Sequence, residues 1–313
     1  MGPPSRKRRL PGVALSWGVA TAPGTHPSPL TSLFPRLRSR TGAEPFRLTA
    51  EQVQSFERDG YVAGIRVLDG QALDAVRDAV ERIRGGVSPH AELLYEVEED
   101  YFRDPERHAF HCLGGWLVEP PLHDLVFHPA ATVPAAQLLG LDRLRFWHDQ
   151  VFYKPPRHPG VVAWHQDFSY WTRTLPMNHV TINVVLDDTT PENGCLHYVP
   201  GSHRWPLLAP VSFGQDMDAF RNFLPADLRD RFRHVPIPLR AGEASLHHPL
   251  MVHGSYGNQT GGPRRAAVLN YMAPDTRSAE GRIPLLKGTP IVPRGEVIGG
   301  AHFPIVLDLG ALP

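Results

Sequence analysis

His165 and Asp167 are the side chains in this sequence whose types and spacing most directly suggest chemistry. They close a run rich in aromatic and β-branched residues, which predicts a β-strand over Val162 to Asp167. Alternate residues of a strand point to the same side, so the imidazole and the carboxylate could reach one metal ion together. A second imidazole would complete a triad of two histidines and one carboxylate, which leaves three adjacent coordination positions open. An oxygenase needs such positions, because a bidentate cosubstrate and O2 must both bind the iron.

A single histidine–x–carboxylate pair does not define a metal site in a chain with 17 histidines, because chance supplies about one such pair. His90 and Glu92 form a competing pair. They lie in a polar stretch beside a predicted helix end, which indicates solvated surface. A third ligand and a partner for the cosubstrate are therefore needed from elsewhere in the chain.

His253 and Arg264 supply that support. If the chain turns through residues 257–262, the strand around Arg264 can lie beside the strand that delivers His253. A guanidinium there can form a two-pronged, charge-assisted pair with the far carboxylate of a dicarboxylate cosubstrate. His247 shares the face of His253 by alternation, but no arginine follows it at the matching spacing. Packing or pocket lining is the interpretation favoured for His247.

Helices are predicted in the first third of the chain. Thr49 and Gln52 form a capping-box pattern, which opens a helix that runs to about Asp59. Apolar residues recur at helical spacing over residues 73–83, and a third helix is expected over residues 130–139. These helices are expected to back a sheet.

Short strands separated by turn residues are predicted from Leu144 onward. In the run from Val180, alternate residues are apolar, whereas Thr181 and Asn183 share the opposite, polar face. Strands at this spacing after a helical lead-in suggest an antiparallel sandwich or barrel. The predicted strands cover residues 145–153, 162–167, 180–186, 195–199, 243–246 and 266–272.

The composition restricts the class of protein. Lys plus Arg and Asp plus Glu each number 32, so no general attraction to nucleic acid or to an anionic membrane is expected. No apolar run approaches the roughly 18 residues that a membrane span needs. Two cysteines in 313 residues indicate a reducing compartment, so a cytoplasmic location is predicted.

Several spaced motifs resemble the phytanoyl-CoA dioxygenase family, and they occur in the family's order. The likeness spans roughly residues 46–275 and includes Lys154-Pro155-Pro156. Its most specific segments are Trp164 to Trp171, Glu192 to Leu196, Val199 to His203 and His253 to Arg264. The resemblance implies a mainly β protein with a helical N-terminal part, namely a double-stranded β-helix (a jelly roll, or cupin-like fold) backed by helices. It also implies Fe(II) as the metal and 2-oxoglutarate and O2 as cosubstrates.

The resemblance assigns roles to individual residues. His165, Asp167 and His253 are implied as the iron ligands and therefore as the catalytic centre. Arg264 is implied to bind the distal carboxylate of 2-oxoglutarate. Its neighbour Arg265 is the alternative, although it should face the other way in a regular strand. The residues implied to line the cosubstrate pocket are Gln150, Gln166 and Ser255.

The reaction implied is hydroxylation of a C–H bond of a small molecule, with release of succinate and CO2. Asp167 favours hydroxylation over halogenation, because related halogenases lack this carboxylate. Asn183 replaces a tryptophan of the animal phytanoyl-CoA enzyme, so the pocket is predicted to be more polar and a fatty acyl-CoA is disfavoured. Tyr170 and Trp171 are further candidates for the substrate pocket. Desaturation or ring formation would use the same residues.

The resemblance also suggests a division of the chain. Residues 1–45, rich in Pro and Ser with a basic start, predict a disordered extension, with a wrongly assigned start of the chain or a targeting segment as the alternatives. Residues 46–275 are expected to form the oxygenase domain, and residues 276–313 a tail that packs on it or extends from it. Residues 210–233 predict a helical insertion, either a lid or a simple surface helix.

Two other functions remain open at this point. A cupin-type metal enzyme would use the same scaffold without 2-oxoglutarate, but it has no need of Arg264. A non-catalytic jelly-roll binding module would use His165 and Asp167 only as hydrogen-bonding core residues. The sequence does not predict an oligomeric state or the identity of the substrate.

Overall fold

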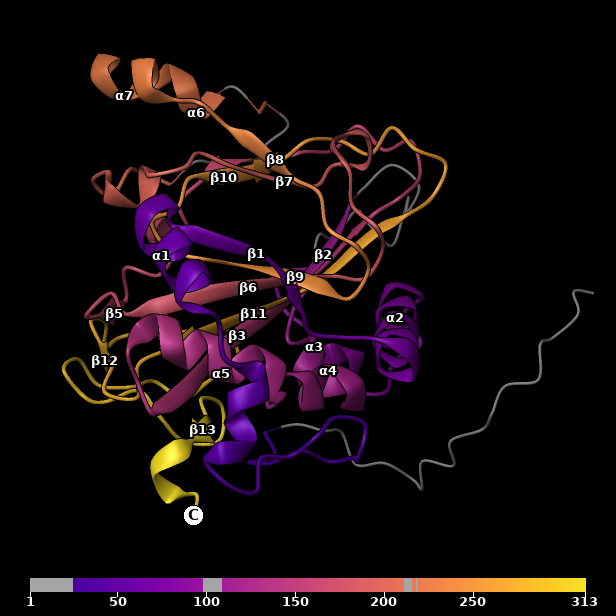
Figure 1. Ribbon diagram of the computed structural model, residues 1–313, viewed down its shortest axis with the longest axis vertical. Helices are drawn as coiled ribbons and strands as arrows, with labels where there is room; N and C mark the ends of the chain where they lie inside the picture. Colours follow the sequence, from indigo (N-terminus) through magenta and orange to yellow (C-terminus); the bar gives the residue numbers. More distant parts are fainter. Residues whose placement is uncertain (1–24, 98–108, 211–215, 218) are drawn as a thin grey trace, which may run out of the picture.

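Two antiparallel β-sheets form the centre of the protein (Figure 1). The computed structural model describes residues 25–97, 109–210, 216–217 and 219–313. The larger sheet has the strand order β1-β9-β6-β11-β3-β13, with β2 also paired to β3, and the smaller sheet has the order β4-β10-β7-β8. This arrangement confirms the predicted jelly roll. The strands are β1 (Tyr61–Arg66), β2 (Phe110–Leu113), β3 (Arg143–Lys154), β4 (Val162–His165), β5 (Thr174–Leu175), β6 (His179–Val185), β7 (Leu196–Tyr198), β8 (Val235–Ile237), β9 (Glu243–His247), β10 (His253–Ser255), β11 (Arg264–Met272), β12 (Arg277–Ser278) and β13 (Ile305–Asp308).

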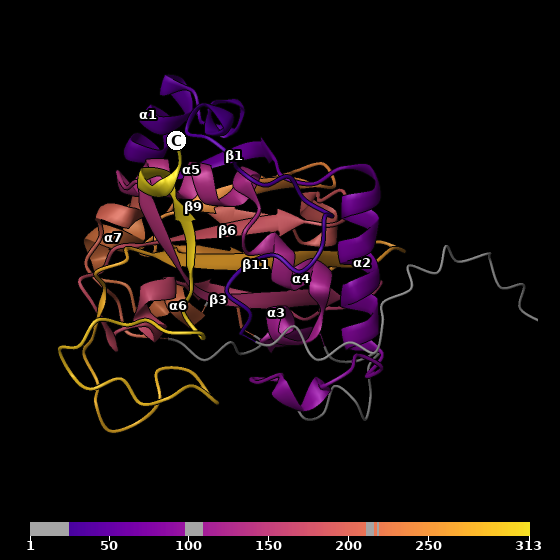
Figure 2. The same cartoon turned by 90° about the horizontal axis from the view of Figure 1, so that it is seen from below.

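The helices of residues 70–139 cover the face of the larger sheet that points away from the smaller one, whereas the helices of residues 219–231 lie on the smaller sheet (Figures 1 and 2). The capping box predicted at Thr49 is present, since its side chain accepts from the Gln52 amide, and Gly60 ends that helix in a left-handed conformation. Among the described residues, no helix is long and apolar enough to cross a membrane. The helices are α1 (Ala50–Asp59), α2 (Gly70–Arg84), α3 (Gly115–Val118), α4 (Pro120–Leu125), α5 (Pro129–Leu139), α6 (Ala219–Asn222) and α7 (Ala226–Arg231), with 3-10 turns η1 (Thr41–Phe46), η2 (Ala91–Leu93), η3 (Asp167–Tyr170), η4 (Pro191–Asn193), η5 (Ser202–Arg204) and η6 (Leu309–Ala311).

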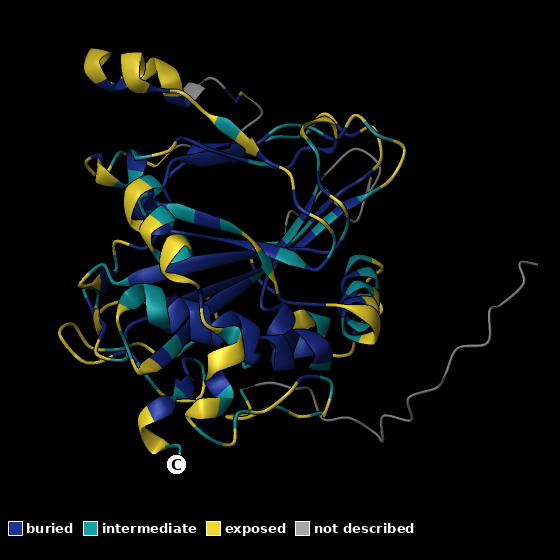
Figure 3. Ribbon diagram, in the orientation of Figure 1, coloured by how far each residue is buried: buried dark blue, intermediate teal, exposed yellow. Residues whose placement is uncertain are grey.

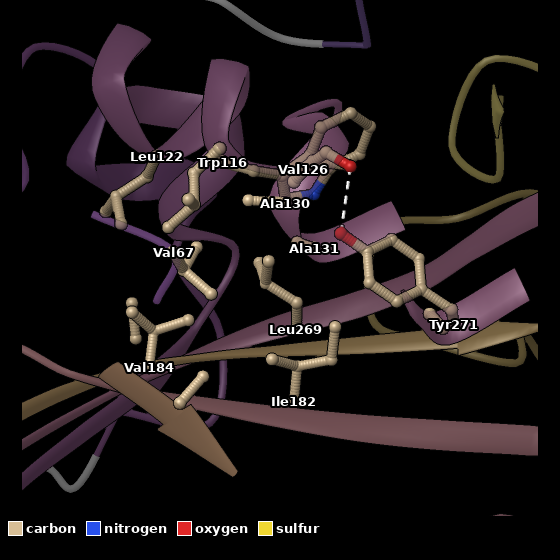
Figure 4. Close-up of a cluster of buried hydrophobic side chains, with 14 of the residues drawn as sticks. Val67, Trp116, Leu122, Val126, Ala130, Ala131, Ile182, Val184, Leu269 and Tyr271 are labelled. Atoms are coloured by element: carbon tan, nitrogen blue, oxygen red, sulfur yellow. Dashed lines mark hydrogen bonds between the residues drawn. The ribbon is translucent and has the colours of Figure 1, made fainter. Parts of the chain in front are cut away.

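The main hydrophobic core lies between helices α2 to α5 and the larger sheet (Figure 4). Ile182 and Val184 of β6 and Leu269 of β11 point into it and are at most 1% exposed. Tyr271 is buried there as well, and its hydroxyl donates to the carbonyl of Val126 at 2.9 Å. Figure 3 shows that the strands of the larger sheet are largely buried, whereas α1, α2 and α7 expose much of their surface. The alternation predicted from Val180 onward is therefore correct.

The described N-terminal residues differ from the predicted disordered extension. Residues 25–45 pack on the domain, and Phe34 is buried. The amides of Leu30 and Thr31 both donate to the carboxylate of Asp124 at 2.7 Å. The prediction of disorder over residues 1–45 is wrong for residues 25–45, because Asp124 and the core bind a segment whose own composition is polar. Residues 1–24 lie outside the described part.

The helical insertion packs away from the cavity described below. Its buried Phe220, Leu228 and Phe232 gather with Trp164 and Val252 on the smaller sheet. None of its described residues lines that cavity. The structure therefore favours the surface-helix alternative over the predicted lid.

Candidate metal and cosubstrate site

Three candidate ligands meet where β4 and β10 lie side by side. His253 is the register partner of His165 in the antiparallel pair, and their rings are 4.1 Å apart. The Nε2 atoms of His165 and His253 lie 3.4 and 3.6 Å from Oδ1 of Asp167. All three side chains are buried. One ligand atom from each lies within 4.8 Å of the others, which is the spacing that a shared metal ion requires.

The backbone at Asp167 differs from the predicted strand. β4 ends at His165, and Asp167 begins the 3-10 turn η3 instead of continuing the strand. The turn is held because the amide of Phe168 donates to the carbonyl of Pro249. The prediction of a strand through Asp167 is wrong, although both side chains still face the same point.

The protonation pattern of the two histidines fits a metal ion. Nδ1 of His165 lies 2.8 Å from the carbonyl of Ala163, and Nδ1 of His253 lies 2.9 Å from that of Met251. Each Nδ1 therefore carries the hydrogen, and a neutral ring directs the Nε2 lone pair at Asp167. Burial, followed by the proximity of His165, lowers the pKa of His253 well below its usual value, which keeps this ring neutral. Three electron-pair donors then face one point, as a divalent cation needs.

Asp167 remains ionised at this position. Its burial acts to raise the pKa, but the proximity of His253 and the close contacts with His165 and His247 outweigh burial and hold the pKa well below its usual value. An ionised carboxylate beside two imidazoles matches the facial triad of non-haem iron oxygenases. The donor set therefore fits Fe(II).

Arg264 fits the distal carboxylate of a dicarboxylate cosubstrate. It is 2% exposed, and its Nε and Nη2 atoms find no hydrogen-bond partner among the described residues. Burial lowers its pKa to about 10, so the guanidinium is still charged at neutral pH. Arg265 points to the other face and pairs with Asp187 and Glu81 at 2.6 and 3.0 Å. Strand alternation thus places Arg264, and not Arg265, at the site.

A cavity of about 300 Å³ joins the triad to Arg264. Its wall includes most of the residues predicted to contact cosubstrate or substrate, and it also receives side chains that the sequence interpretation missed. The predicted residues that line it are Gln150, Ser255, Asn183, Tyr170 and Trp171. The lining residues not predicted include Glu96, His111, His148, Arg173 and Thr181. Of these, only Thr181 had a signal in the sequence, namely its place on the polar face of a predicted strand.

Gln166 is not brought to the cavity. Its amide nitrogen donates to the carbonyls of Pro206 and Leu250 at 3.2 and 3.1 Å, and its oxygen accepts from the amide of Leu208 at 2.8 Å. Gln166 lies between His165 and Asp167, which both face the candidate metal position, so the side chain of Gln166 points the opposite way. Its observed contacts brace the chain behind the triad.

Lys154 is a second buried basic side chain near Arg264, and the sequence interpretation left it without a role. Its Nζ atom donates to the hydroxyl of Ser255 and to the carbonyl of Tyr256, both at 2.5 Å. Burial, followed by the proximity of Arg264, lowers the pKa of Lys154 well below its usual value. Lys154 therefore anchors the chain just after His253.

Comparison with known proteins supports the same interpretation. The model of the phytanoyl-CoA dioxygenase family matches residues 56–266. Phytanoyl-CoA dioxygenase domain-containing protein 1 of Bos taurus is 26% identical over 267 residues, which cover 72% of this chain and 90% of that protein. Ectoine dioxygenase of Nocardia farcinica is 27% identical over 237 residues, covering 71% of this chain and 77% of that protein. The structure of the non-haem α-ketoglutarate-dependent carbocyclase SnoK from nogalamycin biosynthesis matches with a TM-score of 0.65 and 25% identity, covering 84% of this chain and 97% of that one.

Proposed function

The chain belongs to the phytanoyl-CoA dioxygenase family and is a non-haem iron- and 2-oxoglutarate-dependent dioxygenase, and from that premise we propose the role of each residue in its cavity. His165, Asp167 and His253 hold the iron, and Arg264 binds the distal carboxylate of 2-oxoglutarate. Gln150 and Ser255 line the cosubstrate pocket. The observation that carries these assignments is the cavity in which three metal-binding atoms share one space with the buried guanidinium of Arg264, whose Nε and Nη2 atoms have no hydrogen-bond partner among the described residues. That guanidinium argues against a cupin-type site without 2-oxoglutarate.

The bound iron with 2-oxoglutarate and O2 supplies the oxidising power to hydroxylate a C–H bond, and succinate and CO2 are the coproducts. The protein's own residues orient and shield this chemistry. Backbone carbonyls fix the tautomers of His165 and His253, so that both rings are ready to bind metal. Burial of the triad limits the access of water.

The substrate that we propose is a small zwitterion, which Arg173 and Glu96 would recognise. Both residues line the cavity, and within the described chain they form no ion pair with each other or with other residues. Among the described residues, the guanidinium of Arg173 makes one hydrogen bond, from Nη1 to the carbonyl of Pro284 at 2.9 Å. Burial raises the pKa of Glu96, and the charge of Arg173 partly opposes this effect. An anionic group of the substrate would meet Arg173 and a cationic group Glu96, with Tyr170 and Trp171 beside the carbon skeleton.

We propose the division of the chain expected from the sequence, and contacts of the C-terminal segment support it. Residues 46–275 form the oxygenase domain, and residues 276–313 contribute to it, since Leu286 lines the cavity and β13 pairs with β3. We also propose a cytoplasmic location, which the free, buried Cys112 and Cys195 support.

Anaerobic titration of the metal-free protein with Fe(II) and then 2-oxoglutarate tests the function. The expected result is a weak visible metal-to-ligand charge-transfer band, which is absent in His165→Ala. Fe(II) binding without a band on addition of 2-oxoglutarate would support the cupin-type alternative, and no Fe(II) binding would support a binding module. Succinate release with a panel of zwitterions, in wild type and Arg173→Gln, then tests the substrate class. Equal turnover of zwitterions by both proteins would overturn the role of Arg173.

A further inference from the structure

The two carboxylate oxygens of Asp167 have different surroundings. Oδ1 faces the two histidine ligands, whereas Oδ2 is bonded by side chains of the larger sheet. Nε2 of His247 lies 3.0 Å from Oδ2, and Oγ1 of Thr181 lies 2.7 Å from it. His247 and Thr181 are register partners on the neighbouring strands β9 and β6, so both side chains reach the same oxygen. Both are at most 2% exposed.

A chain of hydrogen bonds fixes the direction of these contacts. An ionised carboxylate only accepts, so Nε2 of His247 must carry the hydrogen. With this hydrogen on Nε2, Nδ1 of His247 accepts from the hydroxyl of Tyr198 at 2.9 Å, and the oxygen of Tyr198 accepts from Ser245 at 2.8 Å. Tyr198 belongs to the smaller sheet and Ser245 to the larger one. This series of hydrogen bonds therefore connects the two sheets behind the triad.

We infer that His247 and Thr181 are positioning residues that hold Asp167 as a ligand through one oxygen only. A carboxylate can bind a cation through one or both oxygens. Two hydrogen bonds to Oδ2 commit that atom to the protein and leave Oδ1 for the metal. The coordination position that Oδ2 of a bidentate Asp167 would occupy then remains available for 2-oxoglutarate or O2. This inference rests on the proposed function.

Co(II) titration of the metal-free protein tests the inference. The visible absorption of bound Co(II) reports both the affinity of the site for the metal and the coordination number of the metal. Loss of an outer hydrogen bond to a ligand typically weakens metal binding by about 10–100-fold. We expect that loss, with a changed Co(II) spectrum, in His247→Phe and Thr181→Val. His247→Gln and Thr181→Ser keep a donor and should restore much of the affinity and the wild-type spectrum.

Tyr198→Phe is the matched control for a structural effect. It removes a buried hydrogen bond from the same cluster but leaves both donors on Oδ2 in place. Its affinity for Co(II) should stay close to wild type, even if its melting temperature falls. Circular dichroism of each metal-free variant checks that it is folded.

The outcomes are distinguishable. Folded His247→Phe and Thr181→Val with wild-type affinity and spectrum would overturn the inference. The same applies if Tyr198→Phe loses as much affinity as they do, or if Thr181→Ser and His247→Gln recover nothing. A wild-type protein that binds neither Co(II) nor Fe(II) would instead overturn the proposed function. If a variant of His247 does not fold, the two Thr181 variants test the inference. If a variant of Thr181 does not fold, the two His247 variants test it.

Discussion

The two faces of strands β6 and β11 have opposite chemistry. On the helix side, Ile182, Val184 and Leu269 form part of a closed apolar core. On the cavity side, alternate positions of the same strands carry polar or charged groups, such as Thr181 and Arg264. One sheet therefore provides packing free energy on one side and preorganised polar groups on the other. Site residues therefore alternate with core residues, so the strands that pack the core also position the polar groups of the cavity.

Val184→Ala and Val268→Ala test the contrast in packing, since they remove the same atoms on opposite faces. Val184 is fully buried on the helix side, whereas Val268 lines the cavity. Val184→Ala should lower the free energy of unfolding by about 2–3 kcal/mol, because a closed core cannot refill the space. Val268→Ala should lower the free energy of unfolding by less than half as much. Urea denaturation of the metal-free proteins measures both, and equal losses would break the comparison.

Arg264→Lys and Arg265→Lys test the contrast in chemistry, because these neighbours face opposite sides. A lysine at position 264 keeps the charge but loses the two-pronged geometry, so a charge-assisted contact worth about 1.5–3 kcal/mol is weakened. The apparent affinity for 2-oxoglutarate should fall by about 10–100-fold. Arg265→Lys should leave that affinity within about 2-fold of wild type, since Arg265 pairs with Asp187 and Glu81. The charge-transfer band titrated with 2-oxoglutarate measures both variants.

Local patterns in the sequence predicted much of this arrangement. The capping box at Thr49 and the alternation from Val180 depend on near neighbours, and both are confirmed. Likewise, alternation distinguished Arg264 from Arg265. These features follow from the periods of helices and strands, which a single sequence displays.

Contacts between distant segments were not predictable in the same way. The hydrogen bond from Thr181 to Asp167 requires the exact end of β4, which the sequence interpretation placed too late. The bond from Arg173 to Pro284 depends on the course of the C-terminal segment. Residues 25–45 look unstructured alone, but Asp124 provides their anchor from far along the chain. Such contacts are set by tertiary structure, which composition and periodicity do not encode locally.

The cavity side should also make stability depend on pH, which the apolar face cannot do. His179 of β6 lies on the cavity side of that strand by alternation and is 1% exposed. Burial, followed by the proximity of His148, lowers its pKa to about 3, and burial lowers that of His148 to about 4. Both rings are therefore neutral in the folded protein at pH 5, whereas the unfolded chain binds protons there.

The sign of the effect follows from this difference in bound protons. Because the unfolded state takes up more protons, the contribution of each ring is fully present above about pH 6.5 and is lost as the pH falls toward the folded pKa. The slope is about 1.4 kcal/mol per pH unit for each ring between these limits. His179→Gln should remove one such contribution and flatten the dependence between pH 6.5 and pH 4.5, as urea denaturation of the metal-free protein would measure. An unchanged slope in His179→Gln would mean that this ring is protonated in the folded state, and the cavity side would then carry a buried charge instead of a neutral polar lining.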